Sequence, residues 1–323
     1  MTKAIRIHAT GGPEVLKWEQ LPTPQPGPTE ALIRHEAVGL NFIDIYFRNG
    51  LYKTALPTTP GMEGAGTVLA VGEHVQDLTP GDRVAYAGGP LGAYATERVI
   101  PADRLVKLPP EIDTKTAAGA MLQGMTAYFL LHRTFAVQAG QTILVHAAAG
   151  GVGLIMCQWA AHIGARVIGV VSTKAKAEIA RAHGAAHVIV GHETLAAEVR
   201  RLTGGAKVPV VYDGIGRDTF DASLDCLAPL GLMVSYGNAS GPVPPFDISI
   251  LNAKGSLFLT RPGFATYTAN RADLTQAAAG LFAVLKSGAV KIHINQSFAL
   301  EDAALAHEAL EARRTTGSTV LLP

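Results

Sequence analysis

Small residues in the pattern Ala148-x-Gly150-x-x-Gly153 follow the apolar run Ile143–Val145 and precede a helix-like segment, 154–163. Glycines allow a tight turn, and the backbone N–H groups that begin a helix bind phosphate oxygens. The spacing is that of a dinucleotide fingerprint with alanine in place of the first glycine. An ordinary strand–helix turn would also fit the glycines alone. The strand and helix around them favour nucleotide binding.

The second strand of such a fold ends in the segment Val170–Lys176, which lacks a carboxylate and carries Ser172, Lys174 and Lys176. In NAD-binding folds an acidic residue here accepts hydrogen bonds from the adenosine ribose. A lysine instead attracts a 2′-phosphate, so NADPH is favoured over NADH. The alternative is that Ser172 caps the next helix and both lysines are solvated surface charges.

From residue 141 onward, apolar strand-like segments alternate with helix-like ones. This alternation predicts a doubly wound parallel sheet, the Rossmann form of the α/β class. The segments are strands over 142–145, 166–171, 187–190, 208–213, 232–235 and 256–259, and helices over 174–182, 195–202 and 219–227. Pro209 is tolerable only near the start of its strand.

Residues 1 to about 120 contain short strands bounded by glycine and proline, without strand–helix alternation. They predict a mostly β domain, followed by a helix over 116–131. After Arg261 we expect a helix over 274–287, one more strand and a helix over 301–313, too few elements for a separate domain. The expected domains are therefore 123–261 for the nucleotide and 1–122 with 262–323 for the mostly β part.

The composition is that of a globular protein: of 323 residues, 48% are hydrophobic and 16% charged, with a net charge of +1. The near-neutral charge argues against nucleic acid as the main partner. Two cysteines form no disulfide framework. The N-terminal segment lacks the apolar stretch of a signal peptide, and no apolar run is long enough to cross a bilayer. We expect a cytoplasmic protein.

Several motifs together resemble the zinc-independent, ζ-crystallin-like NADPH:quinone oxidoreductases of the medium-chain dehydrogenase/reductase superfamily. These motifs cover nearly the whole chain and are 39–44, Arg83–Tyr86, 146–153, Val210–Asp213, Ser235–Asn238 and 313–318. The resemblance implies a GroES-like first domain completed by the C-terminal segment, a cofactor in an interdomain cleft, a homodimer, and hydride transfer from NADPH to a quinone without a metal.

The resemblance also assigns residues by matching positions. Those expected to act in catalysis are Asn41, Tyr46 and Tyr52. Those expected to bind cofactor are Asn41, Asp44, Thr126, Gly150, Gly151, Val152, Ser172, Lys176, Tyr236, Arg261 and Arg313. Relatives place a tyrosine near the 2′-phosphate just after the third strand. This chain has Val190-Gly191-His192 there, and His192 is either a substitute or an exposed loop residue.

No metal is expected, because zinc-dependent relatives place a cysteine and a histidine where this chain has Asn41 and Met62. Each assigned side chain also has a structural interpretation. Tyr46 and Tyr52 could be packing aromatics, and Asn41 and Asp44 could cap the helix expected over 42–48. For His146, at the end of an apolar strand, we favour a structural role.

Two other functions remain open at this stage. The same scaffold and hydride donor could serve an NADPH-dependent reductase of α,β-unsaturated carbonyls (enones and alkenals). A non-enzymatic crystallin or RNA-binding role, as ζ-crystallin suggests, is the alternative of a different class. Because fold does not fix the acceptor, the quinone rests on the resemblance.

Overall fold

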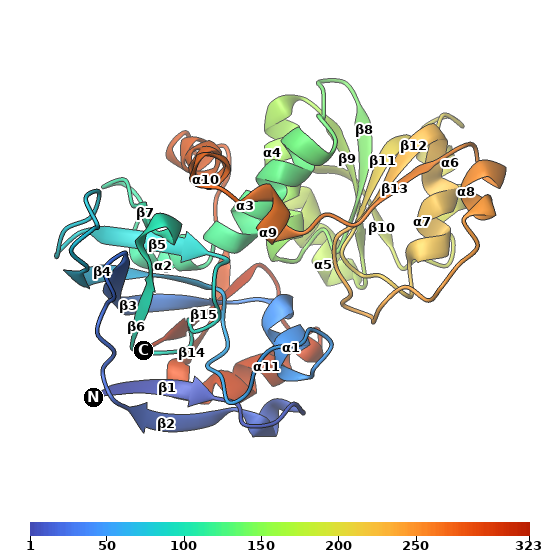
Figure 1. Ribbon diagram of the computed structural model, residues 1–323. Coiled ribbons are helices and arrows are strands. Elements are labelled where there is room, and N and C mark those ends of the chain that lie inside the picture. The colour runs from blue at the N-terminus through green and yellow to red at the C-terminus, as the bar shows by residue number, and fades with distance from the viewer. The chain divides into compact units, whose positions relative to one another are not determined.

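A computed structural model describes all residues, 1–323, and the chain divides into two compact units. The first contains 1–125, 268–286 and 292–323, and the second contains 126–267 and 287–291. Figure 1 labels the elements of each unit. No helix combines the length and the apolar character needed to span a membrane.

The second unit is built on one six-stranded parallel sheet in the order β10-β9-β8-β11-β12-β13. The strands are β8 (Thr142–His146), β9 (Arg166–Val171), β10 (Ala185–Val190), β11 (Val208–Asp213), β12 (Leu227–Ser235) and β13 (Phe258–Thr260). The chain runs outward from β8 to one edge and then from β11 to the other. This confirms the doubly wound α/β fold and puts the topological switch point between β8 and β11.

Helices cover both faces of this sheet, with α4 and α7 on opposite sides (Figure 1). They are α4 (Gly151–Ile163), α5 (Lys174–Ala182), α6 (Leu195–Leu202), α7 (Phe220–Cys226), α8 (Ser249–Ala253) and α9 (Phe264–Tyr267), with a π-helix over Leu130–Thr134. The central strands are buried on both faces, which explains their continuous apolar sequences. Pro209 stands where the β11–β12 register shifts, so its missing N–H interrupts the ladder only at the start of β11.

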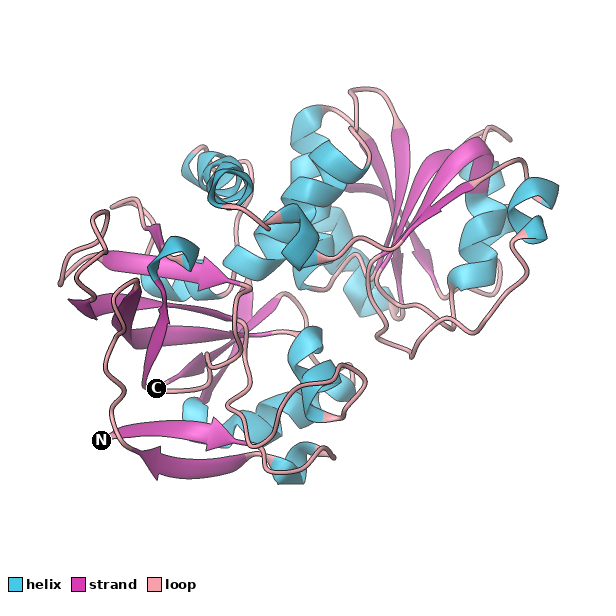
Figure 2. Ribbon diagram, in the orientation of Figure 1, coloured by secondary structure: helices cyan, strands magenta, loops and turns pink.

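The first unit is mostly β, as expected (Figure 2). A seven-stranded sheet has the order β14-β15-β3-β4-β5-β7, with β6 also paired to β3, and β1 and β2 form a separate ribbon. The bounds are β1 (Thr2–Arg6), β2 (Lys17–Leu21), β3 (Glu30–Leu40), β4 (Glu63–Val71), β5 (Arg83–Ala87), β6 (Glu97–Pro101), β7 (Val106–Lys107), β14 (Ile294–Ala299) and β15 (Ser318–Leu322).

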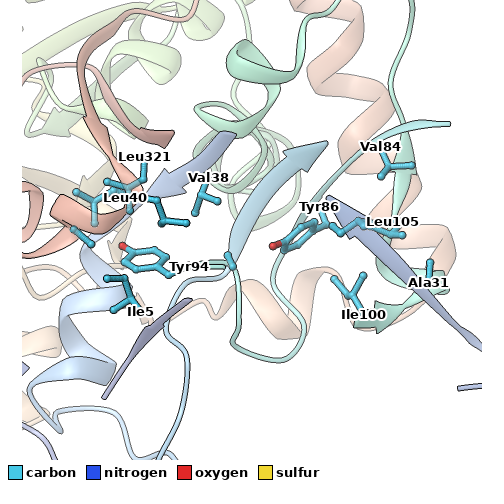
Figure 3. Packing of buried hydrophobic residues seen from close by; sticks show 14 of the residues in the cluster. Ile5, Ala31, Val38, Leu40, Val84, Tyr86, Tyr94, Ile100, Leu105 and Leu321 are labelled. Carbon is cyan, nitrogen blue, oxygen red and sulfur yellow. The ribbon is translucent and has the colours of Figure 1, made fainter. Parts of the chain in front are cut away.

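Five α-helices belong wholly or partly to this unit, and three short 3₁₀ turns join its strands. The helices are α1 (Phe42–Arg48), α2 (Thr114–Ala118), α3 (Met121–Phe129), α10 (Arg271–Lys286) and α11 (Ala303–Glu311). The 3₁₀ turns are Pro13–Val15, Ala102–Arg104 and Leu300–Asp302. Tyr86 and Tyr94 lie among aliphatic side chains in the core, with their hydroxyls bonded to His35 and Asp44 (Figure 3).

Two sequence predictions about elements were wrong in part, and one strand was not predicted. The helix expected over 116–131 is two helices, because Asp113 caps α2 and Gly119 ends it. The helix after the glycine turn begins at Gly151 rather than at residue 154. The final strand β15 was missed altogether; it is short and terminal, and it forms because β14 and β3 offer it edges on both sides.

Candidate active site

The glycine turn lies between β8 and α4, beside the switch point of the parallel sheet. Gly150 is the N-cap of α4, and no side chain caps this helix start. The first-turn N–H groups of α4 are therefore available to an anion. A Cβ on Gly153 would collide with the backbone carbonyl oxygen of Ala147, so this position requires glycine. The left-handed backbone falls on Ala147, at φ 50°, and not on the residue that replaces the first glycine.

Other expected cofactor residues follow neighbouring strands at the same edge of the sheet. Ser172 follows β9, Tyr236 follows β12, and the paired ends His146–Val170 and Asp213–Ser235 show that these strands end in register. Arg261 Nη1 donates to the carbonyl oxygens of Ser235 at 2.9 Å and Gly237 at 3.0 Å, which fixes the loop after β12. Ligands of doubly wound sheets bind at this carboxyl edge.

Thr173, and not Ser172, caps α5. Its hydroxyl oxygen accepts a hydrogen bond from the Lys176 N–H at 3.2 Å, so the alternative role for Ser172 was wrong. Ser172 is exposed, and Lys176 is half-buried in the first turn of α5. His192 is exposed in the loop after β10, where the Gly191 N–H donates to the Val171 carbonyl at 2.9 Å.

His146 has a structural role, as expected from its place at the end of β8. Its Nε2 lies 2.9 Å from Ser223 Oγ, inside a buried cluster organised by Asp213. The Asp213 carboxylate accepts hydrogen bonds from the N–H groups of Ile215 and Gly216 and from Thr219 Oγ1. Burial lowers the pKa of His146, against the opposing charge of Asp213. The cluster holds the turn after β11 in place.

In the first unit, Asn41 is the N-cap of α1, and the Asp44 carboxylate accepts a hydrogen bond from the Asn41 backbone N–H at 2.9 Å. The Asn41 side chain faces the other way. Its Nδ2 donates to Glu63 Oε2 at 2.6 Å, and its Oδ1 accepts from Gln123 Nε2 at 3.1 Å. The structural alternative for Asp44, a helix cap, is therefore correct, and the Asn41 amide is bonded at both ends.

A buried chain of donors converges on Asp44. Arg48 Nη1 donates to His307 Nδ1 at 3.0 Å, so the ring proton of neutral His307 lies on Nε2, 3.0 Å from the Tyr94 hydroxyl. The hydroxyl in turn donates to Asp44 Oδ2 at 3.0 Å. Burial lowers the pKa of His307 to about 3 and raises that of Asp44 to about 7. Asp44 Oδ1 has no hydrogen-bond partner.

Tyr46 and Tyr52 form an aromatic cluster at the end of α1. Their ring centroids lie 5.3 Å apart in an edge-on arrangement, and Phe47 stacks edge-on against Tyr52. Tyr46 is buried and Tyr52 half-buried. The structure thus places Asn41, Asp44 and both tyrosines on or beside one short helix.

The two remaining expected residues stand on other elements. Thr126 is half-buried on α3, in the second unit, and Arg313 is exposed on the left-handed turn between α11 and β15, in the first. No group of three or more His, Cys, Asp or Glu side chains could hold a metal ion.

Sequence reasoning missed Glu63 and Gln123 as partners of Asn41. Glu63 is fully buried, although it opens β4, and Gln123 is buried among apolar residues of α3. A charged or amide side chain inside an otherwise apolar segment is the signal that could have identified both, because buried polar groups need partners. Which partners they find is a tertiary property.

Comparisons with known proteins agree with this architecture. Residues 27–110 match the alcohol dehydrogenase GroES-like domain and 151–279 the zinc-binding dehydrogenase family. The chain is 52% identical to a quinone oxidoreductase of Pseudomonas aeruginosa over 100% of both chains, and 44% identical to a 2-haloacrylate reductase of a Burkholderia species over 100% of this chain and 99% of that one. The structure of the Escherichia coli quinone oxidoreductase complexed with NADPH is 45% identical and superposes with a TM-score of 0.98 over 100% of both chains. The chain belongs to the quinone oxidoreductases of the medium-chain dehydrogenase/reductase superfamily.

Proposed function

We propose that this protein is an NADPH-dependent quinone reductase that transfers hydride from NADPH to a quinone. The observation that carries the proposal is the uncapped start of α4 at the switch point of the sheet, in a chain that matches quinone oxidoreductases over its full length. Bound NADPH would supply the hydride. The protein's own residues would bind it, orient it and position the acceptor.

The residues of the second unit fit a dinucleotide phosphate. Gly151 and Val152 present backbone N–H groups, whereas the Gly150 N–H donates to the Ala147 carbonyl oxygen at 2.8 Å and shapes the turn. Glycine at 153 lets α4 approach this turn. Ser172 and Lys176 flank the start of α5, and the sequence 170–176 contains no Asp or Glu, which favours a 2′-phosphate over a bare ribose. Thr126, Tyr236, Arg261 and Arg313 are proposed as further cofactor contacts by their match to the family positions.

The residues around α1 suit a flat, conjugated acceptor. Tyr46 and Tyr52 offer aromatic faces and hydroxyls, and Asn41 keeps one N–H beyond its bond to Glu63. Asp44 is fully buried and accepts two hydrogen bonds on Oδ2, so it orients Asn41. A reduced quinone spreads its charge over an aromatic ring and can take its proton from water. No single side chain need then serve as a general acid.

The test is NADPH consumption by the purified protein across a panel of quinones, enones and aldehydes. We expect turnover with quinones to exceed turnover with the other classes, and NADH to be a poorer donor. If no quinone consumes NADPH, the proposal is wrong.

Reduction of α,β-unsaturated carbonyls is the second candidate, supported by the likeness to a 2-haloacrylate reductase. Saturating a carbon–carbon bond leaves an enolate that needs a proton, and a tyrosine hydroxyl could supply it. Tyr46→Phe and Tyr52→Phe separate the two reactions. We expect each to slow quinone turnover modestly; a loss of about 10²-fold or more with NADPH affinity intact would indicate a general acid and favour the enone reaction.

We further propose a homodimer that works in the cytoplasm. Support for the dimer comes from β13, an edge strand paired only with β12, on which Phe258 is 59% exposed. Exposed apolar edges are usually paired or covered. Both cysteines are free and buried, which suits a reducing compartment.

A further inference from the structure

Four side chains from different parts of the first unit form a continuous hydrogen-bonded row: Glu63, Asn41, Gln123 and Ser318. Asn41 joins Glu63 at 2.6 Å and Gln123 at 3.1 Å, and Ser318 Oγ lies 2.8 Å from Gln123 Oε1. All four are nine-tenths or more buried. Water therefore reaches the row poorly, and at each contact along the row a donor must face an acceptor.

Both ends of the row have fixed backbone partners. The Leu122 N–H donates to Glu63 Oε1 at 2.7 Å, and the Gly119 carbonyl oxygen lies 2.7 Å from Ser318 Oγ. Gly39 packs against Glu63 so closely that a Cβ there would collide with the carboxylate and with the Ala118 carbonyl. Glu63 is thus held in one place, with one oxygen committed to Leu122 and the other to Asn41.

The direction of donation along this row depends on Glu63. An ionised Glu63 only accepts, so Asn41 turns its NH₂ toward it, Gln123 turns its NH₂ toward Asn41 Oδ1, and Ser318 donates to Gln123. A neutral side chain at position 63, either protonated Glu63 or the glutamine of Glu63→Gln, has a donor in place of the acceptor Oε2. The direction of donation is then reversed in each bond of the row. Asn41 then turns its oxygen toward residue 63, and Ser318 accepts from Gln123 while donating to the Gly119 carbonyl. The Ser318 hydroxyl makes both directions complete, because it has an acceptor within reach either way.

We propose that Glu63 is a positioning residue that sets which end of the Asn41 amide carries the hydrogen-bond donor offered to the bound reactants. Ionised Glu63 leaves the second Nδ2–H of Asn41 for an oxygen that gains negative charge as hydride arrives. Neutral Glu63 puts a lone pair in that place. The inference deepens the proposed function and rests on Asn41 contacting the reactants there.

Electrostatics adds a pH dependence to this arrangement. Burial raises the pKa of Glu63 to about 8, against the hydrogen bonds from Asn41 and Leu122. The titratable groups that face it are Asp44 on α1, Tyr86 on β5 and Tyr94 in the loop between β5 and β6. Burial raises the pKa of both tyrosines and keeps them neutral. The charge of Asp44 raises the pKa of Glu63 further. The donor direction of Asn41 therefore changes near pH 8.

The first experiment reads the amide directly, without turnover. Protein labelled with ¹⁵N at asparagine side chains is titrated by NMR, with the Asn41 signal assigned by its absence in Asn41→Ala. We expect a downfield, carboxylate-bonded Nδ2–H signal at high pH that is lost as pH falls through about 8. In Glu63→Gln the signal should be absent at every pH.

A swapped pair distinguishes positioning from a simple need for a buried charge. Glu63→Gln with Gln123→Glu keeps the charge and the volume, but it moves the carboxylate to the other side of Asn41. We expect the downfield signal to return, because the Asn41 NH₂ now faces the carboxylate at position 123 and its oxygen faces position 63, the reverse of the parent protein. The melting temperature should match that of the parent. Should the double variant fail to fold, Glu63→Gln alone still tests the inference. This variant should fold, because the glutamine can accept from the Leu122 N–H and donate to Asn41 Oδ1.

The second experiment measures turnover of NADPH with a quinone. We expect both Glu63→Gln and the swapped pair to lose about tenfold in kcat, the equivalent of one hydrogen bond, with NADPH affinity unchanged. The parent protein should lose activity below about pH 8, and Glu63→Gln should lose that pH dependence. Glu36→Gln, a carboxylate bonded only to the Thr67 and Thr114 hydroxyls, is the matched control and should behave like the parent.

Two results would overturn the inference. One is the absence of the downfield signal in the swapped pair, because the Asn41 NH₂ would then not face the carboxylate at position 123. The other is full turnover in the swapped pair, since the donor direction would then not matter. Absence of quinone turnover in the parent protein would refute the proposed function instead, and the NMR result would stand by itself.

Discussion

At the scale of single residues, the unusual feature of this protein is a pair of buried carboxyls beside the expected site. Asp44 and Glu63 are both fully buried, and burial raises their pKa values to about 7 and about 8. Their hydrogen bonds come from neutral groups: backbone N–H, a tyrosine hydroxyl and an amide. Without a cation against them, ionisation costs the folded state more than the unfolded one.

This pair gives stability a definite dependence on pH. Both pKa values are higher in the folded than in the unfolded chain, so their contribution is complete near pH 4 and is lost as pH rises to about 8. His35 and His307, whose pKa values burial lowers to about 3, act oppositely but only below about pH 6.5. We expect the free energy of unfolding to fall between pH 6.5 and 8.5, by up to about 1.4 kcal/mol per pH unit for each proton. The melting temperature should fall with it.

Thermal unfolding monitored by circular dichroism across that interval tests the expectation. In Glu63→Gln the fall should become shallower, because one of the two titrating groups is gone. A melting temperature that rises between pH 6.5 and 8.5 would show that the carboxyls are ionised throughout.

Lys176 is the residue on which the choice between NADPH and NADH should depend. It lies in the first turn of α5, four residues after the exposed Ser172, and the sequence of this segment, 170–176, contains no Asp or Glu. A charge-assisted contact with phosphate contributes about 1.5–3 kcal/mol, so Lys176→Ala should weaken NADPH binding about tenfold or more and leave NADH unchanged. Calorimetric titration with both cofactors measures this, with Lys174→Ala as the neighbouring control. Equal losses for both cofactors would mean that Lys176 supports the loop only.

At the scale of elements, the junction of β8 and α4 depends on a close backbone approach. A side chain at position 153 has nowhere to go, because the nearest atoms are the backbone atoms of Ala147 and Ala148. Backbone cannot rotate away as a flexible side chain can. The junction therefore tolerates alanine at 148 but not at 153.

Gly153→Ala should consequently destabilise the protein by about 1–3 kcal/mol and weaken NADPH binding, as α4 shifts from the turn. Gly263→Ala is the control, since a Cβ there has only Thr266 Oγ1 at 3.8 Å and the backbone needs no left-handed conformation. Denaturant unfolding and NADPH titration of both variants measure the effect. Equal stability of the two would show that the turn can open without cost.

At the scale of the whole molecule, the open edge of the parallel sheet has a consequence for assembly. β13 is short, pairs only with β12 and exposes Phe258, whereas the other edge strand, β10, exposes Val190. If two copies join through β13, Phe258→Asp places a charge in the interface and should give a monomer. Light scattering at micromolar concentration decides, with Val190→Asp as the control at the opposite edge. A parent protein that is already monomeric contradicts the dimer.

The sequence by itself determined the parallel sheet and its nucleotide turn. Strands such as β9 and β11 and helices such as α5 and α6 lie at the predicted bounds, because apolar period and turn residues are local signals. The same local signals predicted α1 with Asn41 and Asp44 at its start. Strand–helix alternation also predicted that Gly150 and Gly153 lie in the turn between a strand and a helix, whereas the switch point beside that turn is known only from the strand order of the sheet.

Only the tertiary structure decided what the polar residues face. Glu63, Gln123 and Ser318 come from β4, α3 and β15, and nothing in their spacing shows that they meet around Asn41. β15 itself was missed, because a short terminal strand exists only where other strands supply its hydrogen bonds. Likewise, Thr173 and not Ser172 caps α5, because the backbone geometry determines which of the two adjacent hydroxyls reaches the helix N–H groups. Period and propensity act within a segment, whereas burial and partner choice arise only when distant segments pack together.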